Sequence, residues 1–566
     1  MTGQHLERQH LEQRRDVLKL AAVSAAAFWL PRSARSQAKF TSNPFTLGVA
    51  SGSPTHDSVV LWTRLLPQGN SSVSLAQGNA VSLAQGNSFS LPQGSLNAGL
   101  GNEPVTVHWQ VAHDDKFTRI VQSGQTQAVA ELAHSVHAEV VGLESDRWYF
   151  YRFIAGDAAS PVGRTRTFPA PDAKVNQLRL AYASCQRWEH GYYSAYRHMR
   201  EESPDAVMFL GDYIYEYPGA ANAVRTHSGG WVTTLDDYRQ RYALHKSDAD
   251  LQAMHAACPW LVTWDDHEVQ NDYAGLQAGH SSAVEPASPD NFAARRAAAY
   301  QAFYEHMPVS ASVLTQALQG LATGAELRIY NRVSYGQLAT FYMLDARQYK
   351  DPQPCTKDGK LGSNTFEPAT CAEWPAPGRS MLGAAQEAWL AGEFGKARKA
   401  TNHWNVLGQQ SLFGQRDFAK GPAQLMWNDG WDGYPAARDR LTDSLRKNEV
   451  ANAVLLGGDV HENWVGHVKA DYANMTSASV GVEFCGTSIT SRSNSAARAK
   501  VDEWLGENPH FLFADNKAKG YGVCEFTPGK LTTTLRAVDD VTRKDATIET
   551  LATFNVQAGR AVVERI

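Results

Sequence analysis

Hydrophobic and polar residues alternate along the first part of the chain, up to two prolines near residue 170. The alternation is clearest over residues 105–111, 137–141, 148–153 and 165–168, and it ends at Pro169-Ala170-Pro171. Successive side chains of a strand point to opposite faces, so this pattern predicts short strands with one buried face. Short strands at this spacing are typical of an immunoglobulin-like β-sandwich, which we expect over residues 39–171.

The pattern changes beyond Pro171. Segments such as 192–202 and 381–394 have a helical period, and they alternate with continuous apolar runs over residues 178–183, 206–210, 260–264, 338–344 and 454–456. Strands that are buried on both faces are apolar throughout, so these runs predict the inner strands of an α/β domain over residues 172–566. Within it, residues 271–330 are expected to form a helical insertion.

A low-complexity segment at residues 66–97 interrupts the β-rich region. It repeats the dipeptide Gln-Gly at Gln68, Gln77, Gln85 and Gln93. Its Ser, Gly, Asn and Gln side chains bury too little apolar surface to offset the entropy of ordering, so we predict a flexible loop. A small repeated β-structure is the alternative.

Residues 1–38 have the pattern of an export signal. Arg14 and Arg15 precede an apolar run at residues 20–30, and the small residues Ser36 and Ala38 follow it. Eleven apolar residues are too few for a membrane span, which needs about 20. The paired arginines resemble a twin-arginine signal, although Gln13 stands where Ser or Thr is usual. An ordinary amphipathic N-terminus is the alternative.

The charge balance disfavours nucleic acid as a main partner. The chain has 53 Lys and Arg against 58 Asp and Glu, a net charge of −5. Without residues 1–38, 47 basic and 55 acidic side chains remain, and the net charge becomes −8. No basic excess is present to replace phosphate counterions.

We expect a periplasmic or secreted monomer without a membrane span after the signal is removed.

Polar donors follow four of the predicted strands, at the point where each strand ends. Open α/β sheets bind ligands at the carboxyl ends of their strands. Clustered carboxylates cost several kcal/mol unless cations compensate them, so the four sets together predict a metal centre. The sets are Cys185; Asp212 with Tyr215; Asp265-Asp266-His267-Glu268; and Asp459 with His461.

The types of donor restrict the metal. Carboxylate oxygens suit hard cations, whereas a thiolate beside a phenolate favours a trivalent or redox-capable ion. Cys and Tyr have ordinary pKa values of about 8.5 and 10, so both bind as anions only to a strong Lewis acid. Fe³⁺ therefore fits better than Zn²⁺, and a second, harder divalent ion can share a bridging aspartate.

Several motifs carry a resemblance to a known family. Gly211-Asp212-Tyr213-Ile214-Tyr215 is similar to the GDxxY element of purple-acid-type metallophosphoesterases. Asp265-Asp266-His267-Glu268 resembles a variant of their GNHE or GNHD element, and Gly458-Asp459-Val460-His461 resembles GHxH with Asp in place of the first His. With Ser184-Cys185-Gln186, Leu344-Asp345-Ala346-Arg347-Gln348-Tyr349 and Arg379-Ser380-Met381-Leu382-Gly383, the pattern resembles the PhoD-type alkaline phosphatases over the whole chain except 66–97.

The resemblance implies a metallophosphatase fold: a two-sheet β-sandwich flanked by helices (αββα), preceded by an all-β immunoglobulin- or fibronectin-like domain. It implies Fe³⁺ with one or two Ca²⁺ as cofactors, and it leaves Zn²⁺ or Mn²⁺ as the less suitable choice. By position, Cys185 and Tyr215 would bind iron and Asp212 would bridge to calcium. The remaining implied ligands are Asp266 and Asn271 for calcium, and Asp459 for the iron or the bridge.

The implied activity is hydrolysis of phosphate mono- or diesters, or both, by a hydroxide produced at the metals. His267 and His461 would face either the substrate or the metals, and His267 could protonate the leaving alkoxide. Arg187 would neutralise phosphate or form a surface salt bridge. The partners implied are a phosphate-ester small molecule, polymer or lipid, and the twin-arginine export machinery. The alkaline optimum and the natural substrate stay open.

Two other functions compete with this hypothesis. A cysteine hydrolase would use Cys185 as nucleophile with His267 or His461 as base, but it leaves the strand-end carboxylates unexplained. A non-enzymatic metal-containing binding module is the third hypothesis, and the number of donor sets counts against it.

The other cysteines stand outside the proposed metal set. Cys355 and Cys371 lie in a loop containing Pro and Gly and can form a disulfide in an oxidising compartment. Cys258, Cys485 and Cys524 are expected to pack as small hydrophobic side chains.

Overall fold

The computed structural model describes residues 39–67, 88–89, 100–279, 292–314, 327–357, 361–397, 403–493 and 500–566. The predicted signal at 1–38 lies outside the described residues, as do most of the 66–97 segment and parts of 271–330. Within 66–97, β3 (Ser88–Phe89) pairs in parallel with β12 (Thr226–His227).

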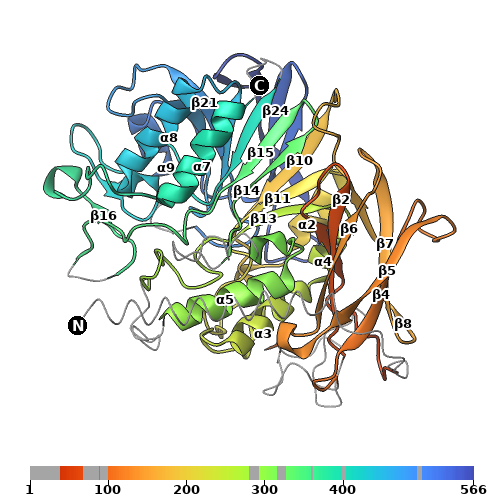
Figure 1. The fold of residues 1–566 in the computed structure, drawn as a ribbon. Coiled ribbons are helices and arrows are strands. Elements are labelled where there is room, and N and C mark those ends of the chain that lie inside the picture. The colour runs from red at the N-terminus through yellow and green to blue at the C-terminus, as the bar shows by residue number, and fades with distance from the viewer. Residues whose placement is uncertain are drawn as a thin grey trace.

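The N-terminal region is a two-sheet β-sandwich (Figure 1). One layer contains β1 (Val49–Gly52), β2 (Ser58–Arg64) and β6 (Ser135–Val141). The facing layer contains β4 (Val105–Ala112), β5 (Ile120–Ala128), β7 (Trp148–Ala155), β8 (Ala158–Ala159) and β9 (Gly163–Arg166). Alternate side chains such as Leu61, Val107 and Phe153 fill the space between the layers, as the alternation in the sequence predicts. A short 3₁₀ helix, η1 (Ala130–Leu132), precedes β6.

The remainder of the chain forms two larger sheets. The first has the order β26-β25-β24-β23-β10-β11-β13 and continues into β1-β2-β6. Its strands are β10 (Leu178–Ala183), β11 (Ala206–Leu210), β13 (Trp260–Thr263), β23 (Lys519–Phe526), β24 (Lys530–Val538), β25 (Ile548–Gln557) and β26 (Val563–Arg565). The second has the order β14-β15-β17-β19-β21-β20-β22, with β14 (Asn331–Tyr335), β15 (Ala339–Met343), β17 (Trp404–Gly408), β19 (Ala453–Gly457), β20 (Asn463–Lys469), β21 (Ser479–Cys485) and β22 (Phe511–Asp515).

Helices cover the outer faces of these two sheets, while the inner faces pack against each other (Figure 1). One outer face carries α2 (Ser194–Glu201), α3 (Leu235–Lys246), α4 (Ala249–His255) and α5 (Phe292–His306). The other carries α7 (Gly383–Lys396) and α8 (Pro435–Lys447). Shorter elements are α9 (Val501–Glu507), η2 (Trp188–His190), η6 (Pro368–Thr370), η7 (Trp431–Gly433), β16 (Thr365–Phe366) and β18 (Met426–Trp427). The αββα arrangement predicted from the resemblance is confirmed.

The central strands are buried on both faces. Every residue of β11, β15, β17 and β19 is buried. Strands β11, β15 and β19 coincide with the apolar runs noted in the sequence, whereas β17, which contains Asn405, does not. Strands β10, β11 and β13 run in parallel, as do β15, β17, β19 and β21. Their carboxyl ends therefore lie along one edge of the paired sheets.

The N-terminal sandwich shares a sheet with the α/β region. Gly52 of β1 pairs in parallel with Trp260 of β13. A Cβ atom on Gly52 would lie 2.4 Å from the Pro308 carbonyl oxygen and 2.8 Å from that of Trp260, so only glycine fits here. Nothing in the alternation of the sequence predicts this junction, because it depends on the close approach of two backbones.

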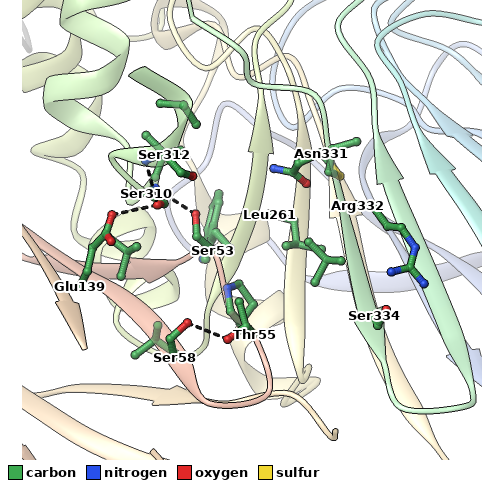
Figure 2. Close-up of a pocket in the computed structure, with 18 of the residues that line it drawn as sticks. Ser53, Thr55, Ser58, Glu139, Leu261, Ser310, Ser312, Asn331, Arg332 and Ser334 are labelled. Atoms are coloured by element: carbon green, nitrogen blue, oxygen red, sulfur yellow. Dashed lines mark hydrogen bonds between the residues drawn. The ribbon is translucent and has the colours of Figure 1, made fainter. Parts of the chain in front are cut away.

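A cavity of about 400 Å³ lies beside this junction, between β1, β2, β6, β13 and β14 (Figure 2). Its hydroxyl groups bond to neighbouring groups in the wall: Ser310 Oγ donates to Glu139 Oε1 at 2.8 Å, and the Ser310 backbone N–H donates to Ser53 Oγ at 3.2 Å. Thr55 and Ser58 form a further pair at 2.6 Å. These bonds connect the two parts of the chain across the cavity.

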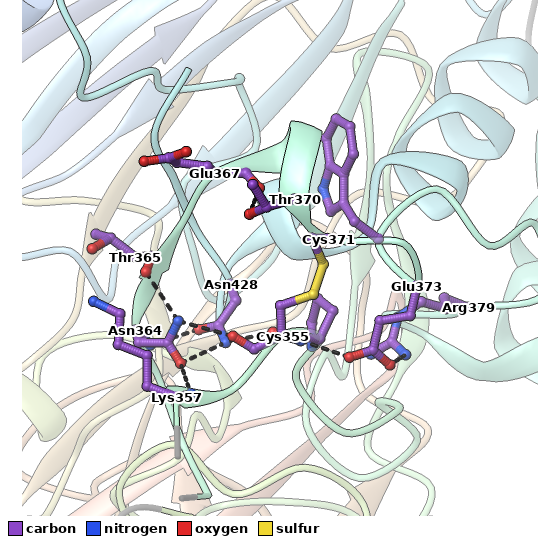
Figure 3. Close-up of a disulfide and its surroundings, with 12 residues drawn as sticks. Cys355, Lys357, Asn364, Thr365, Glu367, Thr370, Cys371, Glu373, Arg379 and Asn428 are labelled. Atoms are coloured by element: carbon purple, nitrogen blue, oxygen red, sulfur yellow. Dashed lines mark hydrogen bonds and ion pairs between the residues drawn. A yellow bond between two sulfur atoms is a disulfide. The ribbon is translucent and has the colours of Figure 1, made fainter. Parts of the chain in front are cut away.

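Cys355 and Cys371 form a disulfide, with their Cα atoms 5.9 Å apart (Figure 3). The loop that it closes contains β16, which pairs with β18. Asn364 and Asn428 bond beside it: the Asn364 N–H donates to Asn428 Oδ1 at 2.7 Å. Cys258, Cys485 and Cys524 are buried and unpaired, as expected.

Among the described helices, none combines the length and the apolar character that a membrane crossing requires.

One buried cation lies next to the strand end that carries Asp212. Lys246, the last residue of α3, is 2% exposed, and its Nζ lies 4.2 Å from the centre of the Trp62 ring and 5.3 Å from that of Tyr213. Burial lowers the pKa of this ammonium group from 10.5 to about 7.

The unfolded chain then holds the Lys246 proton up to a higher pH than the folded chain does. The free energy of unfolding should therefore rise as the pH increases from about 7 to about 10.5, on the order of a few kcal/mol from this group. Replacing it by Lys246→Met should stabilise the protein most below pH 7 and remove this rise, as measured by urea unfolding across the pH range. Lys447→Met, an exposed site paired with Asp443, is the control. Equal pH slopes for Lys246→Met and the parent chain would contradict the prediction.

Candidate metal centre

Four predicted donor sets converge at the carboxyl ends of β10, β11, β13 and β19. The backbone bends sharply there: Cys185, Asp212, Asp459 and His461 have φ angles of 59°, 59°, 67° and 57°. Non-glycine residues rarely adopt this left-handed conformation, and it costs about 1–3 kcal/mol at each position. Four such residues at one site indicate that the fold holds these side chains in a required position.

The first group of donors contains Cys185, Asp212 and His461, whose donor atoms lie within 4.8 Å of one another. The Tyr215 hydroxyl donates to Asp212 Oδ2 at 2.8 Å and lies 3.2 Å from His461 Nε2. Ser491 Oγ lies 2.7 Å from the same hydroxyl and 2.9 Å from the Cys185 carbonyl oxygen. A thiol, a phenol, a carboxylate and an imidazole therefore surround one point.

The orientation of His461 suits a metal ligand. Its Nδ1 lies 3.0 Å from the Arg492 carbonyl oxygen, which accepts a hydrogen bond from it. Burial, assisted by the Lys519 cation, lowers the pKa of His461 to about 3, so the ring is neutral. The Nδ1–H bond then leaves a lone pair on Nε2, on the side of Tyr215.

The second group of donors surrounds a buried guanidinium. Arg347 is 1% exposed; its Nε lies 2.5 Å from Asp265 Oδ1, and its Nη1 lies 2.8 Å from Asp429 Oδ2. Its Nη2 is 3.8 Å from Asp266 and 4.0 Å from Asp459. Two further sets of carboxylates have oxygens within 4.8 Å of one another: Asp265, Asp266 and Asp459, and Asp266, Asp272 and Asp429.

Arg347 and Lys350 are the cations beside these carboxylates, and Lys350 forms an ion pair with Asp429. Together they leave part of the negative charge of the carboxylates uncompensated. Asp212 Oδ1, Asp265 Oδ2 and Asp459 Oδ2 are buried and accept no hydrogen bond from the described residues. Burial raises the pKa values of Asp212 and Asp459 well above the ordinary range for a carboxyl. Oxygens in this state are suited to cations, so the donor set fits a centre of more than one metal ion.

Two acidic residues of the β13 end have structural roles. Glu268 accepts hydrogen bonds from the backbone N–H groups of Asp212, Tyr213 and Asp265, at 3.1, 2.6 and 2.8 Å. It thereby fixes the ends of β11 and β13 to each other. Asp265 uses one oxygen to hold Arg347.

His267 is held by an acidic partner that the sequence analysis missed. Its Nδ1 lies 2.7 Å from Glu216 Oε2, and the other Glu216 oxygen accepts the Asn271 N–H at 2.8 Å. Burial alone would lower the pKa of His267, but Glu216, followed by Asp266 and Asp212, raises it well above its ordinary value. The ring centre lies 4.2 Å from that of Tyr215, so His267 lies beside the donor cluster.

Asn271 and Arg187 lie at the sides of the centre. The Tyr217 hydroxyl donates to Asn271 Oδ1 at 2.9 Å. The Arg187 guanidinium carbon lies 4.4 Å from the centre of the Tyr217 ring and 5.8 Å from that of Tyr215. Its Nε is 3.4 Å from Glu189 Oε2, an ion pair whose acidic partner is buried and not on the surface.

A pocket of about 530 Å³ opens onto this centre. Its metal-side lining consists of Asp212, Asp266, His267, Asn271, Asp272, Asp459 and His461. Asp272 is held there by Ser363, whose Oγ and N–H donate to its Oδ2 at 2.7 and 3.0 Å. Six of the sequence-predicted site residues therefore line this space, whereas Cys185, Tyr215 and Arg187 are not part of its lining.

Sequence reasoning missed Arg347, Glu216, Asp429 and Ser491 as parts of the site. Arg347 belongs to a segment noted for its resemblance, and a charged side chain three residues after the apolar run 338–344 was a usable signal. Glu216 follows Tyr215 directly and carries no distinguishing signal.

Comparison with known proteins identifies the family. The model of the PhoD-like phosphatase family matches residues 180–535, and that of the PhoD-like phosphatase N-terminal domain matches residues 31–169. Alkaline phosphatase D of Bacillus subtilis (strain 168) is 43% identical over 534 residues, which cover 93% of this chain and 83% of that protein. The solved structure of PhoD is 42% identical, with a TM-score of 0.81 over 94% of this chain and 93% of the other. The chain therefore belongs to the PhoD-like phosphatase family, and it is a phosphoric ester hydrolase.

Proposed function

We propose that this phosphoesterase binds Fe³⁺ together with one or two Ca²⁺, and that it hydrolyses phosphate monoesters, diesters or both. The observation that carries the iron assignment is the meeting of Cys185, Tyr215 and Asp212 at the ends of two neighbouring strands. Burial raises the pKa values of Cys185 and Tyr215 well above their ordinary range, and neighbouring Asp212 raises them further. Only a strong Lewis acid keeps both as anions.

Calcium is proposed on the oxygen-rich side. Asp266 and Asn271 would hold it, Asp212 would bridge it to the iron, and Asp459 would serve the iron or the bridge. Carboxylate and amide oxygens are the ligands that Ca²⁺ prefers, whereas Zn²⁺ sites use mainly Cys and His in tetrahedral sets. Zn²⁺ or Mn²⁺ therefore fits this donor set less well. His461, with Nε2 directed at the Tyr215 hydroxyl, is proposed as a further donor on the iron side.

When bound, the cations supply Lewis acidity, which lowers the pKa of water and neutralises phosphoryl oxygens. The side chains of the chain then orient the ester. His267, kept protonated by Glu216, donates a hydrogen bond to a phosphoryl oxygen or a proton to the leaving alkoxide. Arg187 lies behind the Tyr215 and Tyr217 rings, where its charge favours the approach of the anion.

Export by the twin-arginine route, to the periplasm or the medium, is proposed from residues 1–38, and the mature protein is proposed to be a monomer. Export of an already folded chain would allow the metals to be selected at assembly. We also propose a division of the mature chain at residue 171. The two separate family matches, at 31–169 and 180–535, support it.

The alternative of a cysteine hydrolase is weakened by the environment of Cys185. A catalytic thiol needs a lowered pKa and an accessible sulfur. Cys185 is 1% exposed, and burial together with Asp212 raises its pKa. A purely structural metal module is disfavoured by the 530 Å³ pocket, since structural metal sites are closed.

The iron assignment predicts a tyrosinate-to-iron absorption band in the visible range. Tyr215→Phe should abolish this band, because it removes the phenolate oxygen, while elemental analysis still finds calcium. Tyr217→Phe is the matched control: its ring centre is 6.5 Å from that of Tyr215, and its hydroxyl bonds Asn271, so it should keep the band. Zinc as the sole metal, with no band in the parent protein, would reject the iron and calcium assignment.

The buried charge of Arg347 predicts a large effect on stability. Arg347→Gln leaves Asp265 and Asp429 without their cation and should lower the free energy of unfolding by about 3–5 kcal/mol. Arg440→Gln removes a partly exposed partner of Glu387 and should cost less than about 1 kcal/mol. Urea unfolding of metal-free protein measures both values. A loss for Arg347→Gln that is no greater than the loss for Arg440→Gln would disprove the central role of this guanidinium.

The proposed role of His267 as proton donor can be separated from a role in binding. His267→Gln should lower kcat for an alkyl phosphate by about 10²-fold or more. The loss should be smaller for 4-nitrophenyl phosphate, whose leaving group needs no proton. Metal content, measured in parallel, should be unchanged. Equal losses for the two esters would show that His267 does not protonate the leaving group.

A further inference from the structure

The pocket that opens onto the metal centre has a second side of different chemistry. Besides the carboxylates it is lined by an apolar group that we call the aromatic wall: Phe418, Leu425, Trp427, Val460 and Trp504. These residues come from the loop after β17, from β18, from the turn after β19 and from α9. Nothing in the metal chemistry requires an apolar surface at this place.

Local contacts hold one part of the aromatic wall in position. The Phe418 N–H donates to the Leu425 carbonyl oxygen at 2.9 Å, and Asp417 Oδ1 accepts the Leu425 N–H at 2.9 Å. Phe418 meets the ring of Trp504 edge-on, with the ring centres 4.7 Å apart. Asn508, just after α9, bonds both the N–H and the carbonyl oxygen of Asp417 at 2.9 Å. This part is therefore fixed before a ligand arrives.

Trp427 forms the other part. It lies in β18, whose partner β16 belongs to the loop closed by the Cys355–Cys371 disulfide (Figure 3). Its indole is partly exposed, and within the part of the chain that the structure describes it makes no ring stack, hydrogen bond or ion pair. Trp504, by comparison, contacts Phe418 edge-on, and Trp374 donates its Nε1–H to the Asp432 carbonyl oxygen. An indole on a pocket wall with its polar and aromatic groups unused is suited to stack on a ligand.

The five side chains of the aromatic wall carry no charge. Beside them, the Arg416 guanidinium, 4.6 Å from the centre of the Phe418 ring, is paired with Glu462 at 2.7 Å, and Lys500 adds one cation to the pocket lining. The wall itself offers apolar contact and stacking to the part of the substrate beyond the phosphate.

We propose that the aromatic wall is the subsite for the alcohol part of the ester, and that it takes a planar aromatic ring stacked on Trp427. This inference rests on the proposed phosphoesterase site, and it specifies the substrate class of that site. An aromatic pair contributes about 0.5–1.5 kcal/mol beyond its buried area, which corresponds to a preference of up to about tenfold over a non-planar ring of similar size.

The test compares benzyl phosphate with cyclohexylmethyl phosphate. Both are esters of primary alcohols with similar leaving groups, and only the planarity of the ring differs. The parent protein should have a kcat/KM several-fold higher for the benzyl ester, through KM. Trp427→Leu should remove this preference, whereas Trp427→Phe, which keeps a ring, should retain most of it. Trp389→Ala, on α7, is the control and should leave the preference unchanged.

Methyl phosphate separates the two levels of the proposal, because it is too small to reach the aromatic wall. Its hydrolysis together with equal kcat/KM values for the two larger esters would overturn the wall assignment and leave the phosphoesterase site intact. An unchanged benzyl preference in Trp427→Leu would also overturn it. Failure on all three esters, with metals bound, would overturn both.

A further arm identifies the source of the aromatic ring. A nucleoside 5′-monophosphate presents a nucleobase, and benzyl phosphate presents a simple aryl group. A rise in KM for both esters in Trp427→Leu supports a nucleotide as substrate, whereas a rise confined to benzyl phosphate supports an aryl alcohol.

Discussion

The site depends on the buried guanidinium of Arg347 among the carboxylates that surround it. Asp265 and Asp429 lie within 2.8 Å of its nitrogens, and Asp266 and Asp459 lie within 4.0 Å. Without such a cation, the ends of β13 and β19 could not approach each other, because their carboxylates would repel across a region from which water is excluded. Arg347 follows β15 in the second sheet, whereas Asp265 follows β13 in the first, so one ion pair also joins the two sheets at the edge where the ligands meet. The oxygens that Arg347 does not reach, on Asp212, Asp265 and Asp459, are the ones that remain for metal ions.

The backbone conformations at the strand ends follow from this arrangement. Each donor must turn back toward the space between the sheets directly after its strand, and Cys185, Asp212, Asp459 and His461 do so with positive φ angles. Hydrogen bonds from Glu268 and Ser491 offset the cost of these conformations. Glu268 fixes three backbone N–H groups, and Ser491 connects Tyr215 to the Cys185 carbonyl oxygen. Strain in the backbone is therefore part of how the centre is preformed.

The apolar runs in the sequence predicted the inner strands β10, β11, β13, β15 and β19, but not β17 or β21. Apolar runs such as 206–210 and 454–456 form buried strands, and the polar residues directly after them lie at the edge of the sheet where these strands end. The contacts of Arg347, Glu216 and Trp427 could not be predicted in this way. Each depends on contacts between distant parts of the chain. Glu216 bonds His267, 51 residues further along the chain, and the position of Trp427 depends on the pairing of its strand with β16. The parallel pairing of β1 with β13 was equally inaccessible, since a single glycine determines it.

The disulfide loop connects the two sides of the pocket. Ser363 within it holds Asp272 on the metal side, and Thr365 pairs with Trp427 on the side of the aromatic wall. The Cys355–Cys371 bond limits the conformations of this loop, so it acts on the carboxylate cage and on the aromatic surface together. Cys355 is partly exposed, and the core between the two sheets contains neither cysteine of the pair. The bond can therefore close after the sheets have packed, which is compatible with the proposed export of a folded chain into an oxidising compartment. Oxidation of this one pair therefore adds rigidity to both sides of the pocket, through Ser363 on the metal side and through Thr365 on the side of the aromatic wall.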